Sequence, residues 1–385
     1  MNPRVKRFAL CIAWLLAILA VATAAEPPRL QYVVIVTRHG VRAPTWEPDR
    51  LKQYSSERWP NFGVPPGHLT QRGRALMKLM GDYYGEWLRG ERLLDGIGCS
   101  SADRVFIWAD TDQRTLETGR ALAESLVPGC AIAVRSLGEA QDDPLFNPLT
   151  APLPLPDLQP AEKAHQPAFR TLNFILTGDA SKSSIDALAT ASTMTENLLL
   201  EYANGFNGPE LGWGRLNASN LLEVMELHTV YADLTRRARE FARPRGGVLL
   251  SRIAASIAQA ATETETANAL GRPGDRVLVI SGHDTNLSNL SGLLGLSWRL
   301  PGYQVDDTPP GGALVFSLWK ESNGRQFVRT QYMAQTLEQM RAQTPLTIKV
   351  PPASQTVGIS GCEGAATDGA CPWPAFERAV QRSLR

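Results

Sequence analysis

The sequence lacks most of the features that mark a non-globular chain. Its 385 residues contain no internal repeat, no long run of one charge and no Cys-x-x-Cys pair, and the formal net charge is only +1. Apolar, charged, glycine and proline contents are ordinary, which excludes disordered, collagen-like, coiled-coil and polytopic membrane chains. A net charge so close to zero gives no electrostatic case for a nucleic-acid partner. The length allows two or three domains, or one large domain carrying an insertion.

Acidic side chains are missing from the first 25 residues, which instead have the pattern of a secretory signal peptide. Three basic residues, Arg4, Lys6 and Arg7, precede an apolar run from Phe8 to Ala22 and then the small residues 22–25. The run is shorter than the ~20 residues that span a bilayer, so we expect export and no membrane contact once residues 1–25 are removed. Removal takes 3 of the 39 basic residues and none of the 38 acidic ones, which leaves a net charge of −2.

Cysteine spacings typical of metal sites are absent too. Cys11 lies in the expected signal peptide, and the four cysteines that remain are typical of disulfides in an exported chain. Three pairings are possible. We expect the local pairs Cys99–Cys130 and Cys362–Cys371, because each closes a shorter loop than either crossed arrangement.

Three short apolar segments predict neighbouring strands. They are Tyr32–Val36, Val105–Ala109 and Arg276–Ser281, and leucines at helical spacing follow the second and third. Continuous apolar strands alternating with helices indicate an α/β fold with a mostly parallel sheet and helices on both faces. The segments Ala313–Trp319 and Gln326–Met333 flank an Asn-Gly turn, which predicts an added antiparallel pair.

Proline divides the chain. Residues 144–160 read PLFNPLTAPLPLPDLQP, which can form neither a helix nor a central strand. The pattern from about 161 to 242 is mainly helical, with runs at Ser192–Ala203 and Asn217–Phe241, and another helix is expected to begin after Thr70 as its N-cap. We therefore expect a signal peptide at 1–25, an α/β domain at 26–150 and 244–385, and an inserted helical domain at 151–243.

Polar side chains follow each of the three predicted strands. Arg38-His39-Gly40-Val41-Arg42 comes after the first, Arg114 lies beyond the second, and His283-Asp284 comes after the third. Ligands of open α/β sheets bind outside the carboxyl ends of the strands, so we expect these side chains to converge.

The residue types at these strand ends suit a phosphate ester. Arginine binds phosphate bidentately, and nearby cations lower the pKa of His39, which keeps a neutral nucleophilic nitrogen available. Gly40 lets the backbone approach a ligand closely or take a positive φ. Asp284 could be a plain N-cap or could donate a proton to a leaving oxygen, with a bound phosphate raising its pKa, and His283 could bind phosphate oxygens. Arg114 could equally be a surface arginine at a helix start.

The residues at two of these strand ends resemble the two-part motif of the histidine acid phosphatase family, the second branch of the histidine phosphatases, and most closely that of bacterial periplasmic phytases and glucose-1-phosphatases. The motif halves are Arg38-His39-Gly40-Val41-Arg42-Ala43-Pro44-Thr45 and His283-Asp284-Thr285-Asn286. Four further segments across the mature chain are similar to family segments: Asp110-Thr111-Asp112-Gln113-Arg114-Thr115, Asp143-Pro144-Leu145-Phe146-Asn147-Pro148, Gly212-Trp213-Gly214-Arg215 and Asp307-Thr308-Pro309-Pro310-Gly311-Gly312.

The resemblance implies an exported, periplasmic or secreted acid phosphatase. It implies that His39 attacks phosphorus to form a phosphohistidine and that Asp284 protonates the leaving alcohol, while the phosphoryl group is bound by Arg38, Arg42, Arg114 and His283. It also implies a smaller helical domain over the site, disulfides matching the two expected pairs, and neither metal nor cofactor. The partner is then a small phosphomonoester, and we expect a monomer. Acidic conditions should favour activity, since Asp284 must begin protonated while cations keep His39 neutral.

Departures from the family pattern bear on the substrate. A lysine that commonly follows the Arg-Ala-Pro-Thr segment in phytase-like members is replaced here by Trp46 and then Glu47, which weakens the case for a highly phosphorylated substrate. Gly40 and Thr45 resemble the phytase form, and Glu196 resembles a residue that lines the pocket from the helical domain, although it could equally be an exposed glutamate. Phytate, glucose 1-phosphate and a broad range of monoesters all stay open.

Two other classes of function also stay open. A metal-dependent phosphohydrolase would use His39, His283 and Asp284 as ligands, but the neighbouring arginines argue against a cation there. A non-catalytic module would bind phosphorylated ligands on the same residues. The remaining histidines, His68, His165 and His228, have no metal-ligand spacing and are expected to be structural.

Overall fold

The computed structural model describes residues 26–96, 98–138, 141–179, 181–362 and 369–385, so the expected signal peptide lies outside the described residues. The described strands form one eight-stranded sheet in the order β3-β2-β4-β1-β5-β6-β7, with β8 beside β6. Strands β3, β2, β4 and β1 are parallel, and β5 to β8 extend the β1 side with antiparallel pairs. The strands are β1 Arg29–Arg38, β2 Val105–Ala109, β3 Val134–Arg135, β4 Val277–Gly282, β5 Ala313–Lys320, β6 Gln326–Ala334, β7 Ala353–Thr356 and β8 Cys371–Pro372.

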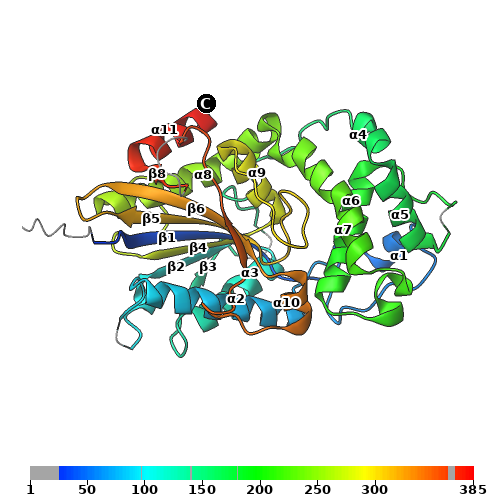
Figure 1. Ribbon diagram of the computed structural model, residues 1–385, viewed down its shortest axis with the longest axis horizontal. Coiled ribbons are helices and arrows are strands. Elements are labelled where there is room, and N and C mark those ends of the chain that lie inside the picture. The colour runs from blue at the N-terminus through cyan, green and yellow to red at the C-terminus, as the bar shows by residue number, and fades with distance from the viewer. Residues whose placement is uncertain (1–25, 97, 139–140, 180, 363–368) are drawn as a thin grey trace, which may run out of the picture.

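Helices cover both faces of the sheet, as Figure 1 shows. Alternate β1 residues point to opposite faces: Val33 and Ile35 pack with helix α2 and helix α3, and Val34 and Val36 pack in the cluster that includes helices α8, α9 and α11. Because both faces of the strand are buried, it reads as a continuous apolar run. The predicted α/β fold is therefore confirmed. These helices are α2 Gln71–Gly90, α3 Gln113–Leu126, α8 Arg239–Thr262, α9 Asp284–Leu294 and α11 Trp373–Leu384.

A second group of helices lies at one end of the sheet, on the right of Figure 1. The predicted run Ser192–Ala203 falls within the longer helix α6. Two 3-10 turns, Gly208–Glu210 and Gly212–Gly214, follow α6, and a third, Ala102–Arg104, precedes β2. The group comprises α1 Pro48–Leu51, α4 Gln159–Ala164, α5 Gln166–Thr177, α6 Leu188–Ala203 and α7 Ala218–Ala232, while the short α10 Leu337–Ala342 lies below the sheet edge.

The predicted helical run over Asn217–Phe241 is helical, but it is interrupted. Helix α7 ends at Ala232, a π-helical turn follows at Asp233–Arg237, and Ala238 has an extended ψ of 133° before α8 begins. The interruption lies against α9, where the Arg237 carbonyl is so close to Gly292 that a Cβ on that glycine would be 2.0 Å from the oxygen. Helical periodicity carries no signal for such a contact between distant segments. The expected division at 243/244 falls inside α8, and the helical insertion stays a prediction.

Local features predicted from the sequence are present elsewhere. Thr70 caps α2 by accepting a hydrogen bond from the Gly73 backbone N–H, and β5 and β6 form the expected hairpin. Both local disulfides, Cys99–Cys130 and Cys362–Cys371, are formed. No helix within the described ranges has the length and apolar character required to span a bilayer.

The parallel strands end together. In the ladder between β1 and β4, Arg38 pairs with Gly282, and in the ladder between β2 and β4, Ala109 pairs with Ser281. The three loops that follow these strands therefore leave the sheet at the same edge, and they carry the residues singled out by the sequence.

Candidate active site

A pocket of about 750 Å³ lies at this edge of the sheet. It brings together five of the candidate residues, from the ends of β1, β2 and β4: His39, Arg42, Arg114, His283 and Asp284. Side chains that sequence reasoning did not select complete the wall, among them Tyr231, Arg236 and Arg245 from α7, the π-helical turn and α8. The expected convergence of the strand-end residues is therefore seen in the structure.

His39 is held rigidly at the end of β1. Its backbone N–H donates to the Gly282 carbonyl at 2.9 Å, and its own carbonyl accepts from Gly311 at 3.0 Å. The ring nitrogen Nδ1 lies 2.8 Å from the Gly40 carbonyl. A carbonyl can only accept, so Nδ1 carries the proton and Nε2 carries the lone pair. The fixed ring thus has a defined nucleophilic atom.

The charge state of His39 is set by burial and by its cationic neighbours. The residue is 2% exposed. Burial lowers the pKa of the imidazole, and Arg38, Arg114 and Arg42 lower it further, to well below its usual range. The imidazole is therefore neutral in mildly acidic solution, which agrees with the reasoning from the sequence.

Gly40 is required for packing rather than for a positive φ. A Cβ at this position would lie 2.8 Å from Cγ of Met77 and 2.9 Å from the Gly73 carbonyl, both in α2. The expected close approach is therefore to a helix behind the loop, and φ is not in the left-handed region.

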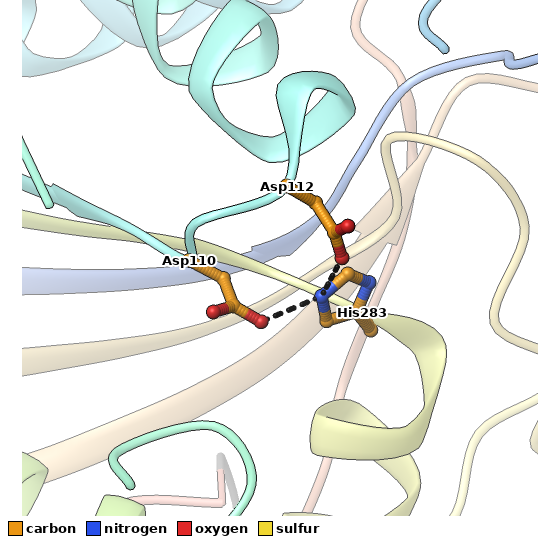
Figure 2. A group of neighbouring side chains, drawn as sticks. All are labelled: Asp110, Asp112 and His283. Carbon is orange, nitrogen blue, oxygen red and sulfur yellow. Dashed lines mark hydrogen bonds and ion pairs between the residues drawn. The ribbon is translucent and has the colours of Figure 1, made fainter. Parts of the chain in front are cut away.

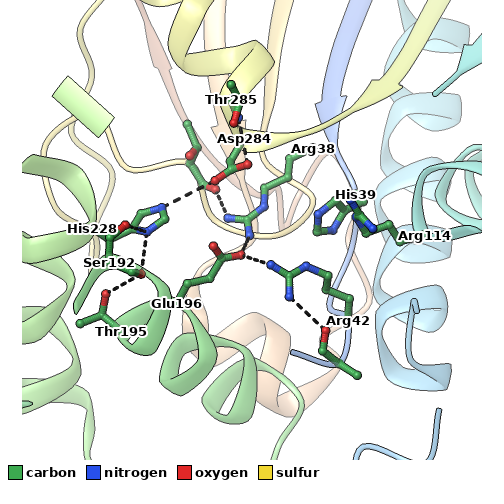
Figure 3. Close-up of polar contacts among 12 residues, drawn as sticks. Arg38, His39, Arg42, Arg114, Ser192, Thr195, Glu196, His228, Asp284 and Thr285 are labelled. Carbon is green, nitrogen blue, oxygen red and sulfur yellow. Dashed lines mark hydrogen bonds and ion pairs between the residues drawn. The ribbon is translucent and has the colours of Figure 1, made fainter. Parts of the chain in front are cut away.

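Glu196 links the two arginines that flank His39. Its Oε1 accepts from Nη2 of Arg38 and, at 2.8 Å, from Nη2 of Arg42. Arg38 is 1% exposed and also donates to the Thr308 carbonyl at 2.5 Å. Figure 3 shows its guanidinium between Glu196 on one side and Asp284 on the other. Glu196 is itself buried, so the alternative of an exposed helix glutamate is wrong.

His283 and Arg114 are paired with acids rather than free. Nε2 of His283 lies 2.8 Å from Oδ2 of Asp110 and 3.4 Å from Oδ2 of Asp112, as Figure 2 shows. Arg114 donates to the same oxygen of Asp112 at 2.7 Å. These contacts hold both side chains at the β2 end of the pocket. The Nε donors of Arg42 and Arg114 are buried without a partner among the described residues, and a phosphoryl oxygen would supply an acceptor.

Asp284 is the first residue of α9, and His283 is the N-cap. The plain N-cap role considered for Asp284 therefore does not apply. Its Oδ1 accepts from the Thr285 backbone N–H at 2.9 Å, and its Oδ2 forms an ion pair with Arg236 and lies 3.8 Å from Nε2 of His228.

The charges around Asp284 set its ionisation in the free protein. Burial alone would raise the pKa of the carboxyl, but Arg236, Arg38 and His228 hold it well below its usual range. Asp284 is therefore ionised in the free protein, whereas the protonation expected from the sequence concerns the state with a phosphate bound.

Thr45 and Trp46 were expected to line the substrate pocket. Thr45 is exposed, and its Cγ2 lies near Gly67, close to the Arg114 guanidinium. Trp46 instead lines a neighbouring pocket of about 480 Å³, where the Arg50 guanidinium lies 3.6 Å from the centre of its ring. The structure thus places Trp46 in a different pocket from His39.

Among the described residues, two groups of three acids and histidines are compact enough to hold a cation. They are Asp110, Asp112 and His283, and Glu196, His228 and Asp284. The ligand set considered from the sequence, His39 with His283 and Asp284, is neither of these. Arginines contact an acid of each group, Arg114 in the first and Arg38, Arg42 and Arg236 in the second, so like charge opposes a cation.

Sequence reasoning missed several residues of this site. Asp110 and Asp112 follow β2, so the strand-end argument that selected Arg114 could have selected them too. His228 was expected to be structural, and Arg236 was not selected. Both belong to helices or turns that reach the site through packing, and nothing in the local sequence marks that approach.

Comparison with known proteins identifies close relatives. The family described as the histidine phosphatase superfamily (branch 2) matches residues 29–153 and 181–333. Phytase AppA of Escherichia coli is 36% identical over 402 residues, covering 92% of each chain. Glucose-1-phosphatase of Salmonella typhimurium is 28% identical over 405 residues, covering 94% of each. Hafnia alvei phytase in complex with tartrate superposes with a TM-score of 0.83 at 34% identity, covering 94% of this chain and 98% of that one.

Proposed function

This chain belongs to branch 2 of the histidine phosphatase superfamily, and we propose that it is an exported acid phosphomonoesterase that works through a phosphohistidine. The observation that carries the proposal is the state of His39. Its Nδ1 is engaged by the Gly40 carbonyl, so Nε2 is the free nucleophile, and three arginines and burial keep the ring neutral. A neutral nucleophile among cations is what attack on a phosphate ester requires.

In the first step Nε2 of His39 attacks phosphorus as the bond from phosphorus to the ester oxygen breaks. The arginines supply donors and positive charge to the phosphoryl oxygens, and His283 adds a further donor. Phosphoryl transfer depends mainly on such positioning and charge neutralisation. Asp284 donates a proton to the departing oxygen, so that an alcohol leaves rather than an alkoxide.

In the second step water attacks phosphorus on the phosphohistidine. Asp284, now ionised, accepts a proton from that water as the bond from Nε2 to phosphorus breaks. It then passes this proton to the phosphate, which leaves as the dihydrogen phosphate monoanion. His39 returns to its neutral state. The residues proposed to bind the phosphoryl group in both steps are Arg38, Arg42, Arg114 and His283.

We propose phytate or a sugar phosphate as the substrate. The relatives include phytases and glucose-1-phosphatases, and the sequence is nearer to the phytase at 36% identity. Hafnia alvei phytase in complex with myo-inositol hexakis sulphate has a TM-score of 0.81 with this chain. Trp46 argues against a highly phosphorylated substrate, because it replaces a lysine of the phytase pattern and lines the neighbouring pocket.

The location and organisation of the protein are also proposals. Residues 1–25 would direct export and be removed, which leaves a monomer in the periplasm. Residues 151–243 would form a helical cap, from which Glu196 reaches the phosphate-binding arginines. The sheet and its covering helices would then hold the reacting residues.

A substrate panel at acid pH tests the proposal. Purified protein should release phosphate from phytate, glucose 1-phosphate and p-nitrophenyl phosphate at unchanged rates in a chelator. Loss of activity in chelator would favour the metal-dependent alternative, and binding without turnover would favour the non-catalytic one. Trp46→Lys should raise kcat/KM for phytate relative to glucose 1-phosphate. An unchanged ratio would contradict the use made of Trp46.

A further inference from the structure

Arg236 contacts the carboxylate that the proposed mechanism uses as its acid. Its Nη1 donates to Oδ2 of Asp284. The Arg236 side chain is 17% exposed and lines the pocket that holds His39. It belongs to the π-helical turn Asp233–Arg237 between α7 and α8. The arginine therefore contacts both the acid and the space that a substrate would enter.

Asp284 is faced by charged groups from three other elements. His228 of α7 places Nε2 3.8 Å from Oδ2, and Arg38 of β1 favours the ionised carboxylate. Glu196 of α6 is an acid that opposes the same ionisation. Burial would raise the pKa of Asp284, but the neighbouring positive charges lower it by more, and Arg236 contributes the largest of these effects. Asp284 is therefore ionised in the free protein.

The three groups that favour the ionised form of Asp284 differ in how tightly the protein holds them. Arg38 is 1% exposed and fixed by Glu196 and by the Thr308 carbonyl. His228 is 2% exposed, and burial lowers its pKa. Arg236 alone of these three lines the pocket. Arg236 is therefore the one of these three that an anion in the pocket would reach directly.

We propose that Arg236 is a positioning residue that holds Asp284 ionised in the free protein and transfers its contact to the substrate phosphate, which lets Asp284 take up the proton that it passes to the leaving oxygen. The inference rests on the proposed function. It adds Arg236 to the proposed mechanism and gives the order of events. The anion binds, Arg236 shifts from the carboxylate to the phosphate, and Asp284 becomes protonated.

The proton balance of this sequence closes. A phosphate monoester has a second pKa of about 6, so in mildly acidic solution it arrives as a monoanion with one proton on a phosphoryl oxygen. That proton moves to Oδ2 of Asp284 and then to the ester oxygen as the bond to phosphorus breaks and the bond to Nε2 of His39 forms. The products are the neutral alcohol and phosphohistidine, and no other proton source is consumed.

The first test compares wild type with Arg236→Gln and Arg236→Lys, using glycerol 2-phosphate as a substrate with a poor leaving group. Protonation of Asp284 in the free protein removes the proton acceptor, so kcat/KM falls at the acid end of its pH profile. Arg236→Gln should move this acid limb up by about one pH unit, which is about a tenfold loss at its lower end. Arg236→Lys keeps the charge and should keep the wild-type limb. At saturating substrate kcat should change less than kcat/KM.

Arg237→Gln is the matched control. Arg237 lies in the same turn but pairs with Asp233 at 2.8 Å and Asp306 at 2.9 Å, away from Asp284. Its acid limb should match wild type. The inference is overturned if Arg236→Gln has the wild-type acid limb, if Arg237→Gln shifts it equally, or if kcat and kcat/KM fall together at every pH. Should these occur while His39→Ala is inactive, the proposed function still stands. An active His39→Ala would refute the proposed function itself.

A measurement on the wild-type protein tests the inference even where an Arg236 variant fails to fold. Sulfate carries no proton at pH 4.5, so protons taken up when it binds go to the protein. Calorimetry of sulfate binding in two buffers of different ionisation enthalpy should show uptake approaching one proton per site for wild type and markedly less for Asp284→Asn. Binding without proton uptake by wild type would overturn the inference.

Discussion

The imidazole rings of His39 and His283 meet edge to face, with centroids 5.6 Å apart and an interplanar angle of 71°. The two residues directly follow different strands, and the parallel ladder between β1 and β4 brings the ends of those strands together. Nε2 of His283 is held by Asp110, and Nδ1 of His39 by the Gly40 carbonyl. Each ring therefore has one nitrogen anchored by the protein, which fixes its orientation before any ligand arrives.

Asp284→Asn should leave phosphate binding nearly unchanged and slow the departure of the leaving group. An asparagine fills the same space and can still accept a hydrogen bond from Arg236, but it cannot donate a proton to an alkoxide. We expect phosphate to bind within about threefold of wild type and kcat for an alkyl phosphate to fall by roughly 10²–10⁴. The kcat for p-nitrophenyl phosphate, which has a good leaving group, should fall far less. An equal loss for both substrates would contradict the role given to Asp284.

Glu196→Gln should weaken the fold and strengthen the binding of phosphate. The change leaves Arg38 and Arg42 as neighbouring buried cations without their shared anion, which costs roughly 3 kcal/mol of unfolding free energy. Phosphate would replace the lost charge, so its affinity should rise by about tenfold, or about 1.4 kcal/mol. Thermal unfolding with and without phosphate measures both effects.

Glu124→Gln provides the control for that experiment. Glu124 also pairs with two cations, Arg74 and Lys78, but on the exposed surface. Exposed ion pairs contribute about 0–1 kcal/mol, so this variant should unfold close to wild type and respond to phosphate as wild type does. Equal behaviour of the two variants would show that Glu196 does not compensate the arginines.

Glu201→Gln should change how stability depends on pH. Glu201 is fully buried in α6, accepts from the Gly212 backbone N–H at 2.9 Å, and has a pKa raised to about 8 by burial. A carboxyl whose folded pKa exceeds its unfolded value stabilises the fold below the unfolded pKa, and that contribution is lost as the pH rises toward the folded pKa. The wild type should therefore lose stability between about pH 4.5 and 8, by at most about 1.4 kcal/mol per pH unit.

Glutamine cannot ionise, so Glu201→Gln should be more stable than wild type at pH 8 and similar to it at pH 5. Urea unfolding at the two pH values measures the difference. Glu223→Gln, an exposed change nearby on α7, serves as the comparison and should leave the dependence unaltered. A Glu201→Gln variant that follows the wild-type pH dependence would show that Glu201 is not the group responsible.

The sequence predicts the sheet and its strand ends well because burial on both faces leaves a clear pattern. Val105–Ala109 is a strand with the predicted bounds, and the loops after β1, β2 and β4 meet as the strand-end rule requires. Contacts between distant helices leave no such pattern. Arg236 reaches Asp284 because the chain leaves α7 in a π-helical turn, and helical periodicity over Asn217–Phe241 gives no sign of that turn.

The ionisation states of the site residues could be predicted only in part from the residues adjacent to them in the sequence. The arginines around His39 could be counted from the sequence, and their effect on its pKa has the predicted direction. The state of Asp284 depends on Arg236 and His228, which lie about 50 residues away in the chain. A titrating group takes its pKa from neighbours in space, so the charge of Asp284 in the free protein could not be predicted from the residues adjacent to it in the sequence.

Transfer of the phosphoryl group to His39 is the central claim, and trapping that intermediate tests it most directly. A substrate labelled with ³²P would be mixed with enzyme, quenched in alkali to preserve phosphohistidine, and digested. The label should appear on the peptide that contains His39 and be absent in His39→Ala, which should retain no turnover. Turnover by His39→Ala, or label on a different residue, would contradict the account.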